Sequence, residues 1–89
     1  MNIDYTVQIW KEGNQYVAHA MPLDVMSAGS TPENAKKALE EAVHLFLETA
    51  RYMGTLDDIL EECGYSVKPN QWTSPLPVVF EKQTLALGF

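Results

Sequence analysis

The sequence predicts an α+β fold in which one long helix and a short helix cover a small antiparallel sheet. Apolar and mostly polar residues alternate over residues 3–10, which indicates a strand with one buried face. Between residues 32 and 53 the apolar residues recur at steps of three and four, which indicates an amphipathic helix. Residues 78–80 and 84–89 read as a final strand, interrupted by a polar triplet that favours a bulge. The expected sheet therefore contains a hairpin, a third strand and this C-terminal strand.

The size and composition indicate a single domain over residues 1–89. An apolar fraction of 46% excludes a disordered chain. No apolar run reaches the length of about 18 residues that a membrane span needs, so no membrane association is expected. The first residues lack the features of a secretory signal, and the lone Cys63 excludes an internal disulfide. A cytoplasmic location follows as the expectation.

The net charge of −6 bears on the kind of partner. The basic residues are spread along the chain and form no stripe that could neutralise phosphates, so direct nucleic-acid binding is not expected. An acidic surface favours a basic partner, mainly through faster encounter. A mildly acidic chain can also be acidic for solubility alone. The net charge by itself therefore leaves open whether the acidic surface binds a basic partner or only keeps the protein soluble.

The first strand is expected to turn at Gly13 and Asn14 into a second strand over residues 15–21, with a short third strand at residues 25–28. A two-residue loop would pair Ile9 with Ala18 and so place small side chains beneath the helix. A three-residue loop would reverse the second strand, because a slip of one residue moves every side chain to the other face. We prefer the two-residue loop, which gives the opposite face four side chains: Trp10, Val17, His19 and Met21.

The segment Ala-Gly-Ser-Thr-Pro-Glu-Asn-Ala, residues 28–35, precedes the long helix. A glycine and hydroxyls ahead of a helix can cradle a phosphate, but neither the P-loop nor the dinucleotide-binding spacing is present. Helix capping explains the same letters. Thr31 as N-cap places Pro32 at the first helical position, whereas Ser30 as N-cap would form a capping box with Glu33. The proline favours Thr31.

The long helix is expected to stop at Gly54, and Thr55 to cap a second helix that runs to Cys63. Residues 66–77 contain three prolines and read as a connection, in which Trp72 would turn inward.

Catalytic and metal-binding patterns are absent from the sequence. His19 and His44 are the only histidines, and neither forms a metal-binding spacing with the other or with Cys63. Cys63 ends a helix, where the dipole does not favour a thiolate. The acidic pairs are sequential neighbours on helices and point about 100° apart. We therefore predict no catalytic residue, metal or cofactor.

Trp10 is the hardest residue to explain as a simple surface position. It follows Thr6 and Gln8 on the polar side of the first strand. It either packs against another part of the chain, such as the C-terminal strand, or lies in an interface, where aromatic residues are enriched.

The stretches YTVQIWKEGNQYVAHAMPLD and SAGSTPENAKKALEEAVHLFLETA, within residues 5–50, resemble the HicB family of antitoxin-like proteins. In that family a hairpin ends in a Pro-Leu pair, and a Ser-x-Gly-x-Thr-Pro-Glu turn leads into a long helix. The closing VVFEKQTLALGF is similar to the final strand of one short subgroup. The resemblance implies a partial ribonuclease H-like fold without catalytic residues.

The resemblance also implies a function. Typical family members bind and inhibit HicA, a small basic RNA-cleaving toxin, and many carry a C-terminal DNA-binding region. This chain departs from that pattern, because no basic DNA-reading helix follows residue 64, and Asp24 and Val25 stand where the family often has Gly-Cys. Autorepression is therefore not expected. Members without the DNA-binding region are frequently encoded alone.

We therefore expect a cytoplasmic, non-enzymatic HicB-like domain that occludes a HicA-type toxin. The expected interface comprises Trp10, Val17, His19 and Met21, together with the C-terminal strand, whose exposed edge could also pair with a second copy. The alternatives are an orphan homo-oligomer and a residual metal-dependent nuclease. For a nuclease the sheet offers only Asp4, Asp24 and Glu81, with no evident cluster for magnesium.

Overall fold

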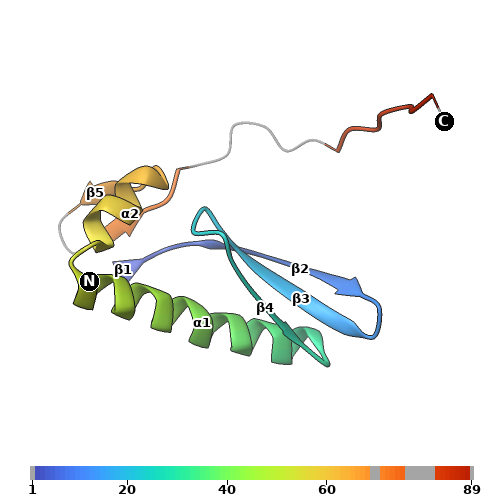
Figure 1. The fold of residues 1–89 in the computed structure, drawn as a ribbon, viewed down its shortest axis with the longest axis horizontal. Coiled ribbons are helices and arrows are strands. Elements are labelled where there is room, and N and C mark those ends of the chain that lie inside the picture. Colours follow the sequence, from blue (N-terminus) through green and yellow to red (C-terminus); the bar gives the residue numbers. More distant parts are fainter. Residues whose placement is uncertain (1, 69–70, 76–81, 89) are drawn as a thin grey trace.

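The computed structural model describes residues 2–68, 71–75 and 82–88. The elements are β1 (Asn2–Ile3), β2 (Thr6–Glu12), β3 (Gln15–Met21), β4 (Val25–Gly29), α1 (Pro32–Met53), α2 (Leu56–Glu62), β5 (Ser66–Lys68) and β6 (Gln71–Thr73). Strands β2, β3 and β4 form an antiparallel sheet, and α1 lies along one of its faces (Figure 1). A second small sheet has the order β1-β6-β5. The predicted α+β class is confirmed.

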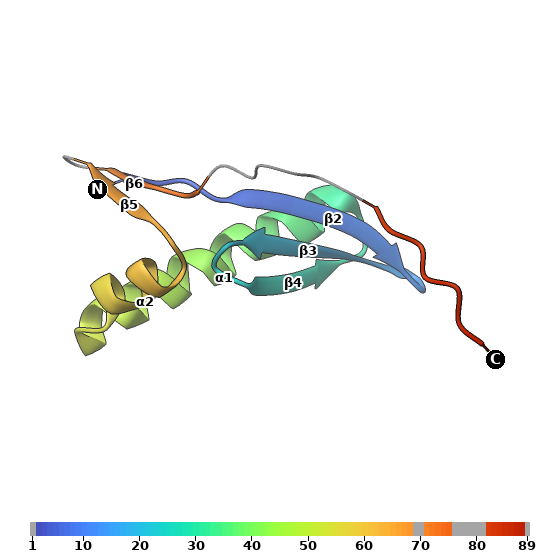
Figure 2. The ribbon, with the colours of Figure 1, turned by 90° about the horizontal axis from the view of Figure 1, so that it is seen from above.

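The hairpin has the preferred register. Ile9 pairs with Ala18, and Val7 pairs with Ala20. The two-residue loop includes Gly13 at a φ of 62°, a backbone conformation that glycine adopts without strain. Ala18 and Ala20 are fully buried on the face beneath α1, so the small side chains allow the helix to approach the sheet closely. Figure 2 shows the three strands side by side across α1.

The start of α1 is a helix cap, as predicted. The Thr31 hydroxyl accepts a hydrogen bond from the backbone N–H of Asn34 at 3.0 Å, and Pro32 stands in the first turn. Gly29 lets β4 end against this turn, because a Cβ there would lie 2.5 Å from the backbone nitrogen of Ala35. The cap thus uses a helix N–H group that a phosphate would need.

The end of α1 is also as predicted, with Gly54 at a φ of 77° donating its N–H to the Arg51 carbonyl. The prediction that the Thr55 side chain caps α2 is wrong. Its hydroxyl donates back to the Ala50 carbonyl at 3.4 Å, and α2 begins without a side-chain cap. The turn between the helices is so short that Thr55 still lies beside the last carbonyls of α1, which lack helical partners.

The connection predicted over residues 66–77 is wrong in part, because it contains β5 and β6. These two strands are antiparallel to each other, and β6 runs parallel to β1 with Ile3 opposite Trp72. Trp72 turns inward as predicted and is 8% exposed. Each strand is only three residues long and the segment is rich in proline, so the local sequence reads as a loop, while pairing with the distant β1 makes it part of a sheet.

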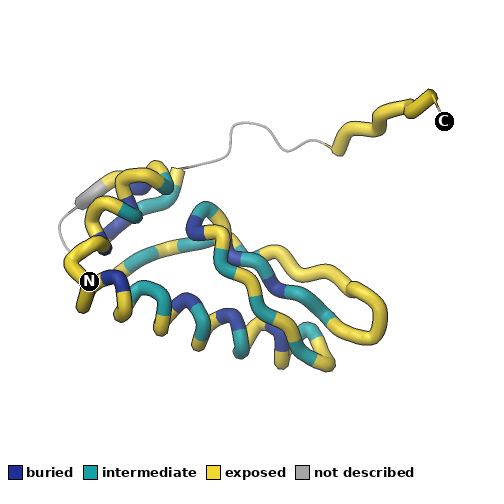
Figure 3. Tube along the Cα trace, viewed as in Figure 1, coloured by how far each residue is buried: buried dark blue, intermediate teal, exposed yellow. Residues whose placement is uncertain are grey.

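The predicted C-terminal strand is not formed by the residues that the structure describes at that end. Residues 82–88 are outside any strand and are all exposed, and they lead away from the rest of the chain (Figure 3). The remainder of that prediction, residues 78–81 and 89, lies outside the described residues. Alternating apolar residues predict a strand only where an edge is available to pair with it.

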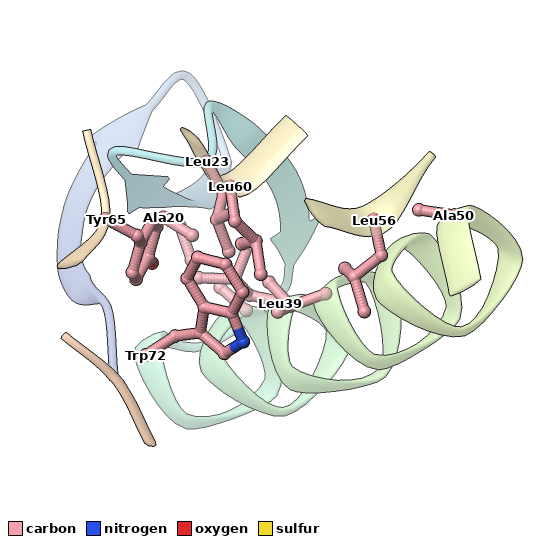
Figure 4. Close-up of a cluster of buried hydrophobic side chains, with 11 residues drawn as sticks. Ala20, Leu23, Leu39, Ala50, Leu56, Leu60, Tyr65 and Trp72 are labelled. Carbon is pink, nitrogen blue, oxygen red and sulfur yellow. The ribbon is translucent and has the colours of Figure 1, made fainter. Parts of the chain in front are cut away.

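The core lies between the sheet, α1 and α2. Leu39 of α1 and Leu60 of α2 are its largest fully buried side chains, and Trp72 packs beside them (Figure 4). At about 1.5 Å per residue α1 is about 33 Å long, whereas a seven-residue strand spans about 23 Å. The helix therefore outruns the sheet, and Met53, expected on the apolar face, is 68% exposed. Within the described ranges no helix combines the length and apolarity needed to cross a membrane.

Candidate protein-binding face

The sheet has one face that α1 leaves uncovered, which we call the open face. Its side chains alternate with those that point toward the helix, as the strand register requires. The open face carries Thr6, Gln8 and Trp10 from β2, Val17, His19 and Met21 from β3, and Met26 and Ala28 from β4. All four side chains that the sequence predicted to share a face do so.

The register brings the predicted residues together in cross-strand pairs. Trp10 lies opposite Val17, and His19 lies between Gln8 on one side and Met26 on the other. Directly opposite residues in neighbouring strands place their Cβ atoms about 5 Å apart, so these side chains form one continuous surface. The sequence did not single out Met26, although the two-residue period of the third strand would have placed it here.

The apolar members of the open face are only partly covered. Trp10 is 37% exposed, Met21 47% and Met26 53%. Among the described residues, β2, which carries Trp10, is an edge strand of its sheet. The sequence left open whether Trp10 packs within the chain or lies in an interface, and its exposure makes it available to a partner.

His19 is the side chain on the open face whose orientation is fixed by contacts on two sides. Its Nε2 donates a hydrogen bond to Oδ1 of Asp24 at 2.6 Å, and its ring meets the Trp10 ring edge-on, with centroids 6.3 Å apart and planes at 77°. The His19 side chain is 16% exposed. Contacts on two sides therefore fix its orientation, which lowers the entropy lost when a partner binds.

Asp24 takes part in the site although the sequence pattern does not predict it there. It occupies the turn between β3 and β4 at a φ of 60°, a conformation that aspartate tolerates better than most residues. Its side chain is 81% exposed, so the carboxylate accepts from His19 while remaining open to solvent. The left-handed turn brings Asp24 beside His19, five residues earlier, and no local sequence pattern predicts that contact.

The carboxylates considered for a nuclease lie in different surroundings. Asp24 pairs with His19, whereas Asp4 accepts a hydrogen bond from the backbone N–H of Ser74 at 2.6 Å. Hydrogen bonding to the Ser74 side chain, with the bond from its backbone N–H, holds the pKa of Asp4 below its ordinary value. Glu81 lies outside the described residues. In the part of the chain that is described, no three His, Cys, Asp or Glu side chains are grouped to hold a metal ion.

Cys63 stands at the end of α2, and His44 stands on α1. Burial raises the pKa of the Cys63 thiol, and the charges of Glu62 and Asp24 raise it further, so the nucleophilic thiolate is disfavoured. His44 is exposed on α1, 3.3 Å from Glu48, beside a groove of about 420 Å³ next to Tyr5. Burial, with the charge of Glu40, raises the pKa of Tyr5.

Comparison of the chain with protein-family models, with curated proteins and with solved structures returned no match. The resemblance to the HicB family therefore rests on the local sequence alone.

Proposed function

We propose that this chain is a HicB-like domain that acts in the cytoplasm by binding a small basic HicA-type toxin and covering its RNA-binding surface. The proposal is supported by the sequence resemblance over residues 5–50 and by an α+β fold in which one face of a small sheet is left open. The single observation that carries it is the arrangement of Trp10, His19 and Asp24 on and beside that face.

The open face has the composition of an interface centre. Trp10, Met21 and Met26 supply exposed apolar surface, and aromatic residues and methionine are enriched where proteins bind each other. Gln8 and Thr6 border this apolar surface on β2. A partly exposed tryptophan held against a fixed histidine is the kind of anchor that a partner's pocket can accept with little loss of entropy.

Charge supports a basic partner. The chain carries a net charge of −6, and Asp24 presents an exposed carboxylate at the end of the open face. A surface that binds RNA is positively charged, because it must neutralise phosphates. The acidic domain would compete for the same lysine and arginine side chains, and its field would speed encounter. Occlusion then needs no catalytic residue, and we propose that the domain is not an enzyme.

Co-purification tests the proposal. A short basic reading frame beside the gene would be co-expressed with the tagged chain, and the affinity of the complex would then be measured by calorimetry. We expect Trp10→Ala and His19→Ala each to weaken binding about tenfold or more, as truncation of an interface anchor does. Tyr52→Ala is the matched control, since Tyr52 is 93% exposed on α1, away from the sheet. Unchanged affinity in both open-face variants would remove the interface assignment.

A second candidate function is an orphan homo-oligomer without a toxin. It is favoured by the exposed leucines of the C-terminal segment, Leu85 at 79% and Leu87 at 60%. The mass of the purified protein in solution tests this candidate directly. The nuclease alternative would be supported only by cleavage of labelled RNA by the purified protein with magnesium or manganese, and we expect none.

A further inference from the structure

The far side of α1 holds a groove that the open face and the proposed toxin do not use. It lies between the C-terminal half of α1 and α2, has a volume of about 400 Å³, and is lined by Ala42, Leu45, Phe46, Thr49, Ala50, Met53, Thr55 and Ile59. None of these residues is charged. By contrast, the similar-sized groove beside Tyr5 is lined by Glu40, Glu48 and Arg51 among others. We call the uncharged one the helix groove.

The helix groove includes apolar side chains that remain exposed and so are not part of the buried core. Leu45 and Met53 line it and are 67% and 68% exposed, and Thr49 lies midway between them at a four-residue step on the same side of the helix. The buried face of α1 runs through other positions, Leu39 and Val43 among them. Leu45 and Met53 lie off this buried face, and both remain exposed.

The C-terminal segment has matching chemistry. Residues 84–88 are uncharged and exposed, and Leu85 and Leu87 stand two apart, which puts both on one side of an extended segment. Leu45 and Met53 are eight residues apart on α1, a rise of about 12 Å, and five extended residues span about 13 Å. An extended segment can therefore run from Leu45 to Met53 with its two leucines, about 7 Å apart, between them.

Residues 82–88 belong to neither sheet. Figure 1 shows the segment near one end of the long axis of the molecule, whereas α2 and the end of α1 lie at the other end. That axis measures 48 Å.

We propose that residues 84–88 of one copy bind in the helix groove of a second copy, with Leu85 and Leu87 between Leu45 and Met53. The exchange is reciprocal and gives a dimer with twofold symmetry. Two chains that each carry a charge of −6 repel, and their uncharged surfaces are where they can meet at least electrostatic cost. The dimer leaves the open face uncovered.

The solution mass tests the dimer. Light scattering on a size-exclusion column should give about 20 kDa for the wild type, twice the 10.0 kDa of one chain. Leu45→Glu, and separately Leu85→Asp with Leu87→Asp, should each give the mass of one chain. All three positions are exposed, so the substitutions leave the core intact. Tyr52→Glu adds the same charge to α1 outside the groove and should remain dimeric. A monomeric wild type, or charged variants that stay dimeric, would overturn the proposal.

Disulfide trapping separates this dimer from other dimers. Leu45→Cys and Leu87→Cys would be made as separate proteins, each with Cys63→Ser to remove the native thiol, then mixed and oxidised. We expect a cross-link between the two different variants. A cross-link formed only between two copies of Leu87→Cys would show tail-to-tail pairing and overturn the groove assignment. Neither experiment contains a toxin, so their outcome is independent of the toxin-binding function, whereas a dimer formed through the helix groove would supply the interface of the homo-oligomer candidate.

Discussion

His19 on β3 donates a hydrogen bond from Nε2 to Oδ1 of Asp24 across 2.6 Å, and this bond joins the open face to the turn that leads into β4. His19 is thereby fixed against Trp10, while most of the Asp24 side chain stays in solvent. The arrangement combines an apolar anchor with an exposed carboxylate at its border. Substitutions in this arrangement can therefore change either the geometry of the open face or its charge.

Asp24→Asn separates charge from geometry at this site. Asparagine tolerates the left-handed turn and can still accept from His19, so the fold should be unchanged. We expect several-fold weaker binding to a basic toxin and a smaller loss of affinity with added salt, because one exposed charge is gone. Calorimetry at low and high salt measures both. The same salt dependence as the wild type would show that Asp24 does not face the toxin's charges.

Tyr65→Phe tests the hydrogen bond that joins the start of β5 to the segment between β1 and β2. The Tyr65 hydroxyl donates to the backbone carbonyl of Asp4 at 2.6 Å, and its loss should lower the free energy of unfolding by about 1 kcal/mol. Urea unfolding measures the change. Tyr52→Phe, at a fully solvated position, is the control and should be neutral.

Alkaline pH gives a second test of the same tyrosine. Burial, with the nearby charge of Asp4, raises the pKa of Tyr65 to about 12 from its ordinary 10.0. The native state therefore holds this proton more tightly than the unfolded chain does. Its contribution to stability is complete below pH 10 and is lost as the pH rises through 12. The stability difference between wild type and Tyr65→Phe should shrink over that interval, and a constant difference would contradict the assignment.

Asp4→Ala should respond to acid in the opposite direction. Hydrogen bonding to the Ser74 side chain, with the bond from the Ser74 N–H, lowers the pKa of Asp4 from its ordinary 3.8, so the unfolded chain binds the proton more readily. The stability that Asp4 provides is present above pH 3.8 and is lost as the pH falls through the lower native value. Urea midpoints of wild type and Asp4→Ala should differ at neutral pH and converge at the acid end. Equal midpoints at neutral pH would show that the bond contributes nothing.

Gly29→Ala tests the close approach of β4 and α1. A methyl group at Gly29 would lie 2.5 Å from the Ala35 nitrogen, so the strand or the helix start must shift. We expect a loss of about 1–3 kcal/mol, the usual cost of overpacking. Gly88→Ala is the matched control, because a Cβ there meets nothing within 4 Å. Thermal unfolding of the pair distinguishes local crowding from a general effect of losing a glycine.

Local signals in the sequence predicted most of the fold. The hairpin register followed from small residues beneath a helix, and the limits of α1 followed from Thr31 and Gly54, whose roles depend only on their neighbours. The parallel pair β1–β6 could not be predicted this way, because Ile3 and Trp72 lie far apart in sequence and each strand is very short. The alternating apolar residues near the C-terminus were misleading for a related reason. A strand needs a neighbouring strand to pair with, and a two-residue apolar period does not show whether one is present.

The candidate site also has one part that local sequence signals predict and one part that they do not. Trp10, Val17, His19 and Met21 share a face because the two-residue period and the hairpin loop together determine it. Asp24 joins them through a turn whose left-handed backbone is invisible in the residue pattern.

The most direct test of the proposed function is a titration of toxin RNA cleavage. Increasing amounts of wild-type chain, Trp10→Ala and Tyr52→Ala would be added to a fixed amount of the HicA-type protein with labelled RNA. Occlusion by the open face predicts complete inhibition by wild type and Tyr52→Ala, and a need for about ten times more Trp10→Ala. Inhibition by Trp10→Ala at the wild-type concentration would contradict an inhibitory role for the open face.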